Sequence, residues 1–206
     1  MSDDKKIILK TSNLKLNYLD LKYPNFSIKL GDFIILRWKS WIWKTSLLKS
    51  ICWLENNFSW ELFIEKDILI NYVFDNYLLI WDFTVVDNLK IENSFKNLET
   101  SDNLLKKIDK YLSDFNILNL KDKLAKNLSS GEKQKIKFIR SILNNPKILI
   151  LDEPTSHLDE KNVYFLLDYI INLSKTTSII FVSHNEFELS YLKNKLKKGI
   201  VTILKL

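Results

Sequence analysis

Apolar positions in the first half of the chain recur at intervals that change along the sequence. They predict short strands separated by turns, at Lys6–Leu9, Leu14–Tyr18, Phe26–Leu30, Phe33–Arg37, Glu61–Glu65 and Asn71–Phe74. Between the fourth and fifth of these strands, Leu47, Leu48, Ile51 and Leu54 fall on one face of a helix. The order strand, loop, helix therefore surrounds residues 38–46.

The second half alternates helical patterns with continuous apolar runs. Residues 85–145 have a mostly helical pattern with no proline and one glycine, Gly131, which predicts an inserted helical lobe. The runs 148–151 and Ile179–Val182 are typical of parallel strands that are buried on both faces. A helical pattern, Val163–Leu173, lies between them, and a polar helix and a last strand, Ile200–Leu204, come after the second run.

The composition indicates one globular domain over residues 1–206, because 46% of the residues are hydrophobic. Cys52 is the only cysteine, so no internal disulfide can form and a reducing compartment is indicated. Burial as a small hydrophobe is the simplest role for Cys52. No apolar run approaches the roughly 18–20 residues that span a bilayer, and the first residues do not resemble a secretory signal. The net charge of +6 comes from lysines interleaved with acids, so no nucleic-acid partner is expected.

Tryptophans occupy the loop after the fourth predicted strand at places where glycine would complete a known motif. With glycine in place of Trp38 and Trp43, the run that ends at Lys44 and Thr45 is G-x-x-x-x-G-K-T, a phosphate-binding loop. Such a loop needs glycine because its backbone visits positive φ and approaches the phosphates closely. The residues expected to contact a nucleotide are Trp38, Lys39, Ser40, Trp41, Ile42, Trp43, Lys44, Thr45 and Ser46.

Three further motifs lie downstream. Leu128-Ser129-Ser130-Gly131-Glu132 opens a predicted helix, Ile148 to Pro154 ends a buried strand in Asp152-Glu153, and Ser183-His184 comes directly after the next strand. With Ser156-His157-Leu158-Asp159 between them, their order and spacing resemble the ATPase subunit of an ATP-binding cassette (ABC) transporter. The resemblance covers essentially the whole chain. It implies an α/β fold, a P-loop NTPase of ABC type with a mainly parallel sheet core, an N-terminal antiparallel β portion and an inserted helical lobe.

The resemblance implies a role for each matching residue. Glu153 would polarise the attacking water, His184 would bond the γ-phosphate, and Asp152 would hold Mg²⁺ together with Thr45. The signature segment, Ser129, Ser130, Gly131 and Glu132, would contact ATP bound to the opposite subunit, and Asp159 would contribute to the dimer interface. For the signature, an ordinary helix N-cap at Ser129 remains an alternative.

Two positions depart from the pattern of the family or match it weakly. The adenine-stacking aromatic is expected at Tyr18, with Tyr23 as an alternative, and either tyrosine could serve only in packing. A glutamine that touches Mg²⁺ in the family is replaced by Asp75, which can also ligate Mg²⁺ but leaves the rate of hydrolysis and the coupling open.

All six tryptophans stand where the family or the local turn would favour glycine, and the chain has only 3 glycines. The affected positions are Trp38, Trp41, Trp43, Trp53, Trp60 and Trp81. One hypothesis is that these codons are UGA, which some bacterial lineages read as glycine. The competing account is a decayed, inactive paralogue, although decay would not spare Lys44, Thr45 and Asp152.

The resemblance therefore implies ATP-driven transport, with ATP and Mg²⁺ as cofactors. The partners would be a separate membrane permease and a second ATPase subunit, either another copy or a paralogue, at the cytoplasmic face of the cell membrane. A non-transport ABC ATPase and a non-catalytic structural homologue are the alternatives.

Overall fold

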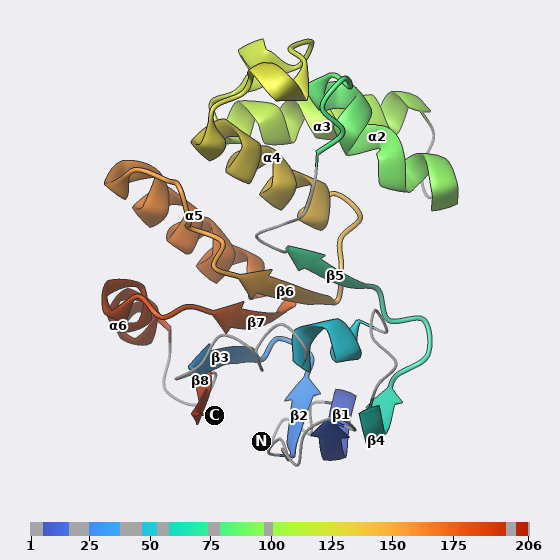
Figure 1. Cartoon of the computed structure of the whole chain (residues 1–206), viewed down its shortest axis with the longest axis vertical. Coiled ribbons are helices and arrows are strands. Elements are labelled where there is room, and N and C mark those ends of the chain that lie inside the picture. The colour runs from blue at the N-terminus through green and yellow to red at the C-terminus, as the bar shows by residue number, and fades with distance from the viewer. Residues whose placement is uncertain are drawn as a thin grey trace.

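The computed structural model describes residues 6–16, 25–37, 47–52, 58–73, 79–96, 101–196 and 201–205. Two sheets organise these residues (Figure 1). The first sheet is antiparallel and has the order β2-β1-β4, with bounds Phe26–Lys29, Ile7–Leu16 and Phe58–Ile64. The second has the order β5-β6-β7-β3-β8, with bounds Ile70–Val73, Ile148–Asp152, Ser178–Val182, Phe33–Arg37 and Val201–Lys205. All its pairings are parallel, so the predicted α/β architecture with an antiparallel N-terminal portion is confirmed.

The prediction of two separate strands at Lys6–Leu9 and Leu14–Tyr18 is wrong, because one strand, β1, runs from Ile7 to Leu16. Its pairing with β4 shifts register between Ser12 and Lys15, and Asn13 there has a φ of 54°. The side chain of Asn25 accepts a hydrogen bond of 2.9 Å from the Asn13 backbone. A bulge of this kind interrupts the alternation of side chains without ending the ladder, so the apolar pattern looked like two strands.

The helices are α2 (Val85–Lys96), α3 (Ser101–Asp114), α4 (Ser130–Ile142), α5 (Glu160–Leu173) and α6 (Glu186–Lys195), with short 3-10 turns at Leu118–Leu120 and Ala125–Asn127. Helices α2, α3 and α4 gather at one end of the molecule, beyond β5 and β6 (Figure 1). Phe115 comes directly after α3, and its ring lies 5.7 Å from the Phe138 ring of α4 and 5.2 Å from the Phe165 ring of α5. In the part of the chain that the structure describes, no helix is long and apolar enough to cross a membrane.

Alternating side chains of the parallel sheet divide the core into two clusters. In β3, Phe33 and Ile35 belong to one cluster, while Ile34 and Leu36 belong to the other. The first cluster contains apolar side chains of helices α2 to α6. The second contains Leu47, Leu48 and Ile51 of the helical turn at 47–51 and side chains of the antiparallel sheet. Both faces are covered, which explains why the central strands β6, β7 and β3 are mostly apolar.

Candidate functional site

The carboxyl edge of the parallel sheet brings together the acids and the histidine that the sequence predicted. Asp152 is the last residue of β6 and pairs with Val182, the last residue of β7. Glu153 therefore comes after one strand and His184 after its neighbour, at the same edge. Every residue of both strands is buried, so the apolar runs fix where these polar side chains emerge.

Glu153 and His184 are in direct contact. His184 Nδ1 lies 2.7 Å from Glu153 Oε1. Because an ionised carboxylate can only accept, the imidazole donates through Nδ1–H and its Nε2 is directed away from Glu153. Glu153 adopts a φ of 48°, and its backbone N–H donates to the Val182 carbonyl at 3.0 Å. A residue other than glycine in this conformation is costly, and such strain is often found at functional sites.

Asp152 directly precedes Glu153 at the end of β6 and is hydrogen-bonded by a side chain of β5. The residue is 7% exposed, and its Oδ2 accepts a hydrogen bond of 3.2 Å from the Tyr72 hydroxyl. Burial, together with the charge of Asp152, raises the pKa of Tyr72, so the phenol remains a donor at neutral pH. A buried carboxylate at a sheet edge supplies the oxygen ligand that Mg²⁺ prefers, so Asp152 fits its predicted role chemically.

The signature segment forms the exposed amino end of α4. Ser129 Oγ accepts from the Glu132 backbone N–H at 3.2 Å, and Glu132 Oε2 accepts from the Ser129 backbone N–H at 2.7 Å. This capping box confirms the N-cap geometry, and the hydrogen bond from the Ser129 backbone lowers the pKa of Glu132. The helix dipole and the remaining N–H groups of the first turn still favour an anion here, so capping and phosphate binding are compatible.

A hollow of about 140 Å³ separates this helix end from the turn before α5. Its lining residues are Ser129, Gly131, Glu132, Lys135, His157, Leu158, Asp159 and Asn162. Asp159 caps α5 by accepting from the Asn162 backbone at 2.9 Å, and this hydrogen bond lowers the pKa of its carboxyl group. A Cβ on Gly131 would lie 3.2 Å from the His157 carbonyl oxygen, so glycine permits this close approach. The structure therefore brings Asp159 and the signature segment to one surface.

Two residues with buried polar side chains connect the elements of the site and were missed from the sequence. Gln134 of α4 donates from Nε2 to the Pro154 carbonyl at 2.8 Å, and Glu188 of α6 accepts from the Thr155 hydroxyl at 2.5 Å. Helical spacing could have indicated Glu188, because it lies one turn before the buried Leu192. Gln134 likewise precedes the buried Phe138 by four residues.

Several predicted site residues lie outside the described residues. They are Tyr18, Asp75 and the phosphate-loop residues Trp38, Lys39, Ser40, Trp41, Ile42, Trp43, Lys44, Thr45 and Ser46. Of the six tryptophans, the structure describes only the side chain of Trp81, which is 64% exposed, with the Lys133 ammonium 5.7 Å from its ring.

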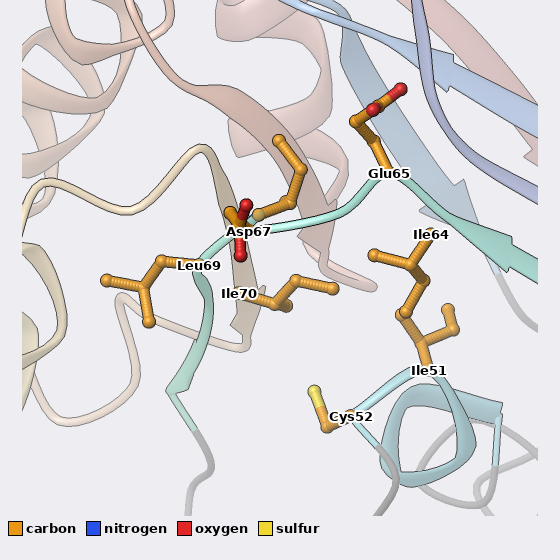
Figure 2. Close-up of a pocket in the computed structure, with 8 residues that line it drawn as sticks. Ile51, Cys52, Ile64, Glu65, Asp67, Leu69 and Ile70 are labelled. Carbon is orange, nitrogen blue, oxygen red and sulfur yellow. The ribbon is translucent and has the colours of Figure 1, made fainter.

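A second hollow, of about 370 Å³, lies at the opposite edge of the sheet (Figure 2). Its walls come from the end of the helical turn at 47–51, the end of β4 and the start of β5, and they include Cys52, Glu65 and Ile70. Ile70 pairs with Ile148, the first residue of β6, whereas Asp152 is the last. This hollow is therefore remote from Asp152 and Glu153. Burial raises the pKa of the Cys52 thiol, which lines the hollow, to about 12.

Comparison with known proteins decides the family. The model of the family described as "ABC transporter" matches residues 21–156, more than half of the chain. The chain belongs to the ABC transporter family. The aliphatic sulfonates import ATP-binding protein SsuB of Bacillus cereus is 28% identical over 85% of the chain and 72% of that relative. The spermidine/putrescine import ATP-binding protein PotA of Spiroplasma citri is 34% identical over 75% of the chain, which spans 47% of that protein.

A solved structure of an inward-facing conformation of an ABC transporter shows the same fold. It superposes with a TM-score of 0.76 at 22% identity, over 89% of this chain and 75% of that chain. The family match and the relatives together confirm the resemblance to an ABC ATPase nucleotide-binding domain, and this structure confirms the fold. The chain is an ATP-binding, ATP-hydrolysing subunit of an ABC transporter, and the non-transport and inactive alternatives are not favoured.

Proposed function

We propose that this ATPase hydrolyses MgATP at the carboxyl edge of its parallel sheet, with Glu153, His184 and Asp152 in the roles that the family implies. The observation that carries the proposal is the contact of 2.7 Å between Glu153 and His184, directly beside the buried Asp152. It brings two carboxylates and an imidazole together at the ends of two neighbouring strands, which supports these roles.

The geometry supports a division of labour among these residues. Glu153 accepts the proton of the attacking water through its carboxylate, and His184 holds that carboxylate in place through Nδ1. The side of the ring that carries Nε2 is turned away from Glu153 and would contact the γ-phosphate. Asp152, with Thr45 and Asp75, would hold Mg²⁺, which neutralises developing charge on the phosphates. Lys44 and the loop residues would hold the nucleotide, with Tyr18 against the adenine.

We further propose that two ATPase subunits, two copies of this chain or a copy and a paralogue, enclose two ATP molecules at the cytoplasmic face of a membrane, docked on a permease. The surface that carries Ser129, Ser130, Gly131 and Asp159 supports this arrangement, because its polar groups lie around a hollow at the surface rather than in the core. Each signature segment would then complete the site of the opposite subunit.

The phosphate loop requires glycine, and we propose that the six tryptophan positions carry glycine in the source organism. The exposure of Trp81 is compatible with this, because a glycine there would remove little buried contact. Peptide mass spectrometry on protein from the source organism decides the matter: glycine at positions 38, 41, 43, 53, 60 and 81 is expected, and tryptophan would refute the proposal.

The catalytic assignment is tested by the Mg²⁺ dependence of hydrolysis in the full chain made with glycine at those positions. Asp152→Asn should raise the Mg²⁺ concentration needed for half-maximal hydrolysis, because a neutral amide is the weaker ligand. Asp102→Asn, at an exposed acid in the first turn of α3, is the matched control and should hydrolyse ATP like the parent. An unchanged Mg²⁺ requirement in Asp152→Asn would remove Asp152 from the metal site.

A further inference from the structure

Glu188 is a buried acid that the roles proposed above do not use. It lies in the first turn of α6 and is only 3% exposed. Its Oε1 accepts a hydrogen bond of 2.5 Å from the hydroxyl of Thr155, which is itself buried. Thr155 belongs to the turn after Glu153, whereas α6 comes after the loop that carries His184. The contact therefore joins the two segments whose side chains meet at the site.

The surroundings of Glu188 are polar but closed to solvent. Burial raises the pKa of its carboxyl group, and the charge of Glu153 raises it further. The hydroxyls of Thr155 and Ser183 and the nearby His184 act in the opposite direction. Ser183 is buried as well, and its hydroxyl accepts from the Asn185 backbone at 3.0 Å.

A buried carboxylate in this position lowers the stability of the fold relative to an apolar side chain. We therefore expect its hydrogen bond to have a role in function. Desolvation disfavours a buried acid, and a leucine would match the apolar Leu189 and Leu192 that accompany it on the inner face of α6. Two residues earlier, Glu186 has an exposed carboxylate paired with Arg37, so α6 also carries an acid where there is little cost. Glu188 differs in that its partner belongs to the turn that carries Glu153.

We propose that Glu188 is a positioning residue for ATP hydrolysis, which holds Thr155 and thereby fixes the Glu153 turn against His184. The hydrogen bond links the two segments that carry the contacting pair. Glu153 needs such support, because its φ of 48° is a conformation that an isolated turn would seldom keep. The inference rests on the proposed catalytic role of Glu153.

The experiment compares four variants of the full chain with glycine at the six tryptophan positions. Glu188→Ala and Thr155→Val each remove one partner, Glu188→Gln keeps an acceptor oxygen, and Glu186→Gln is the matched exposed control. We expect kcat for ATP to fall about 10- to 100-fold in Glu188→Ala and Thr155→Val, with KM within about twofold. Glu188→Gln should retain at least about half of the parent kcat, because its amide oxygen accepts from Thr155. Glu186→Gln should match the parent.

A second readout does not depend on hydrolysis. The chain contains only two histidines, His157 and His184, so histidine-selective NMR resolves the His184 ring directly. Its imidazole signals should move in Glu188→Ala and Thr155→Val and stay in place in Glu186→Gln. If the parent does not hydrolyse ATP, the proposed function fails while this readout still tests Glu188. Parent-like kcat and unmoved His184 signals in Glu188→Ala would overturn the inference. So would a Glu188→Gln variant as inactive as Glu188→Ala, because the negative charge and not the hydrogen bond would then matter.

Discussion

The carboxyl edge of the parallel sheet and the amino end of α4 differ in the hydrogen bonds that position their polar side chains. At the carboxyl edge of the sheet, Glu153 contacts His184 and Asp152 contacts Tyr72, so each acid has a partner on another element of the chain. At the amino end of α4, Ser129 and Glu132 hydrogen-bond to each other's backbone, beside a hollow at the surface. In the first region the contacts join side chains of different elements within one chain, whereas in the second they stay within one helix end at the surface. This difference supports the proposal that the first region serves hydrolysis and the second serves a partner subunit.

The faces of the sheet give this difference a physical basis. Apolar side chains of α4 belong to the cluster on one face, while Leu47, Leu48 and Ile51, which come after the phosphate loop, belong to the cluster on the other face. Gln134 fastens α4 to the turn after Glu153. This hydrogen bond holds α4 on its own face of the sheet. We infer that the signature serves a nucleotide bound by a second subunit.

The largest expected effect comes from a substitution of Glu153 at the carboxyl edge of the sheet. Glu153→Gln should reduce kcat by about 10²- to 10⁴-fold, since an amide cannot accept a proton from water, while ATP binding persists. The unhydrolysed ATP should hold two chains together, so size-exclusion chromatography with MgATP should show a dimer. Glu160→Gln, an exposed acid in the first turn of α5, is the control. Parent-like turnover in Glu153→Gln would place the base elsewhere.

The next largest effect concerns ATP binding by the phosphate loop, which can be measured separately from hydrolysis. The chain with tryptophan at the six positions should bind ATP about 100-fold more weakly than the version with glycine, since left-handed backbone costs roughly 1–2 kcal/mol per residue and indoles in a phosphate loop would compete with the phosphates for space. Isothermal titration calorimetry with MgATP measures this. The single change Trp81→Gly should have no effect on affinity, because that side chain is exposed and lies outside the loop. Equal affinities of the two versions would contradict the steric argument.

A smaller effect is expected from the anchor of Asp152. Tyr72→Phe removes the hydrogen bond to Asp152 Oδ2 and leaves the ring in the core. The rate of Mg²⁺-dependent hydrolysis should fall roughly fivefold, which corresponds to the loss of about 1 kcal/mol from one hydrogen bond. The Mg²⁺ dependence of the initial rate measures the change. Tyr111→Phe, on α3 and remote from the sheet edge, serves as the control. If Tyr72→Phe behaves like the parent, Asp152 does not depend on this hydroxyl.

The smallest effect concerns the capping box, where we expect a change in stability. Glu132→Gln should lower the free energy of unfolding by less than about 1 kcal/mol at pH 7, because the carboxylate is partly open to solvent. Its folded-state pKa lies below the ordinary value of 4.5, so this stability is complete above that pH and is lost as pH falls through the folded pKa. Urea unfolding at pH 7 and at about pH 3 measures it. A difference that persists unchanged at the lower pH would exclude the carboxylate as its source.

The sequence predicted the elements and the edge of the sheet better than the contacts between them. The apolar runs that end in Asp152 and Val182 indicated two parallel strands, and the residues directly after two parallel strands lie at one edge of their sheet. The partners of these residues depend on how helices pack, which the spacing does not contain. Thr155 and Glu188 were missed for that reason. The bulge at Asn13 was missed for a related one, because it depends on a hydrogen bond to a residue twelve positions away.

The comparison of the two regions is tested most directly by mixing two disabled chains. Lys44→Ala damages the phosphate loop and Ser129→Arg damages the signature, so each pure variant should be nearly inactive. Random pairing through an isologous interface gives about half mixed dimers, each with one intact composite site, or about a quarter of the parent's sites. We expect the mixture to recover ATP hydrolysis toward that fraction, provided that one site can act alone. Parent-like hydrolysis by pure Ser129→Arg would contradict it, because the signature would then contribute nothing to the nucleotide of a second subunit.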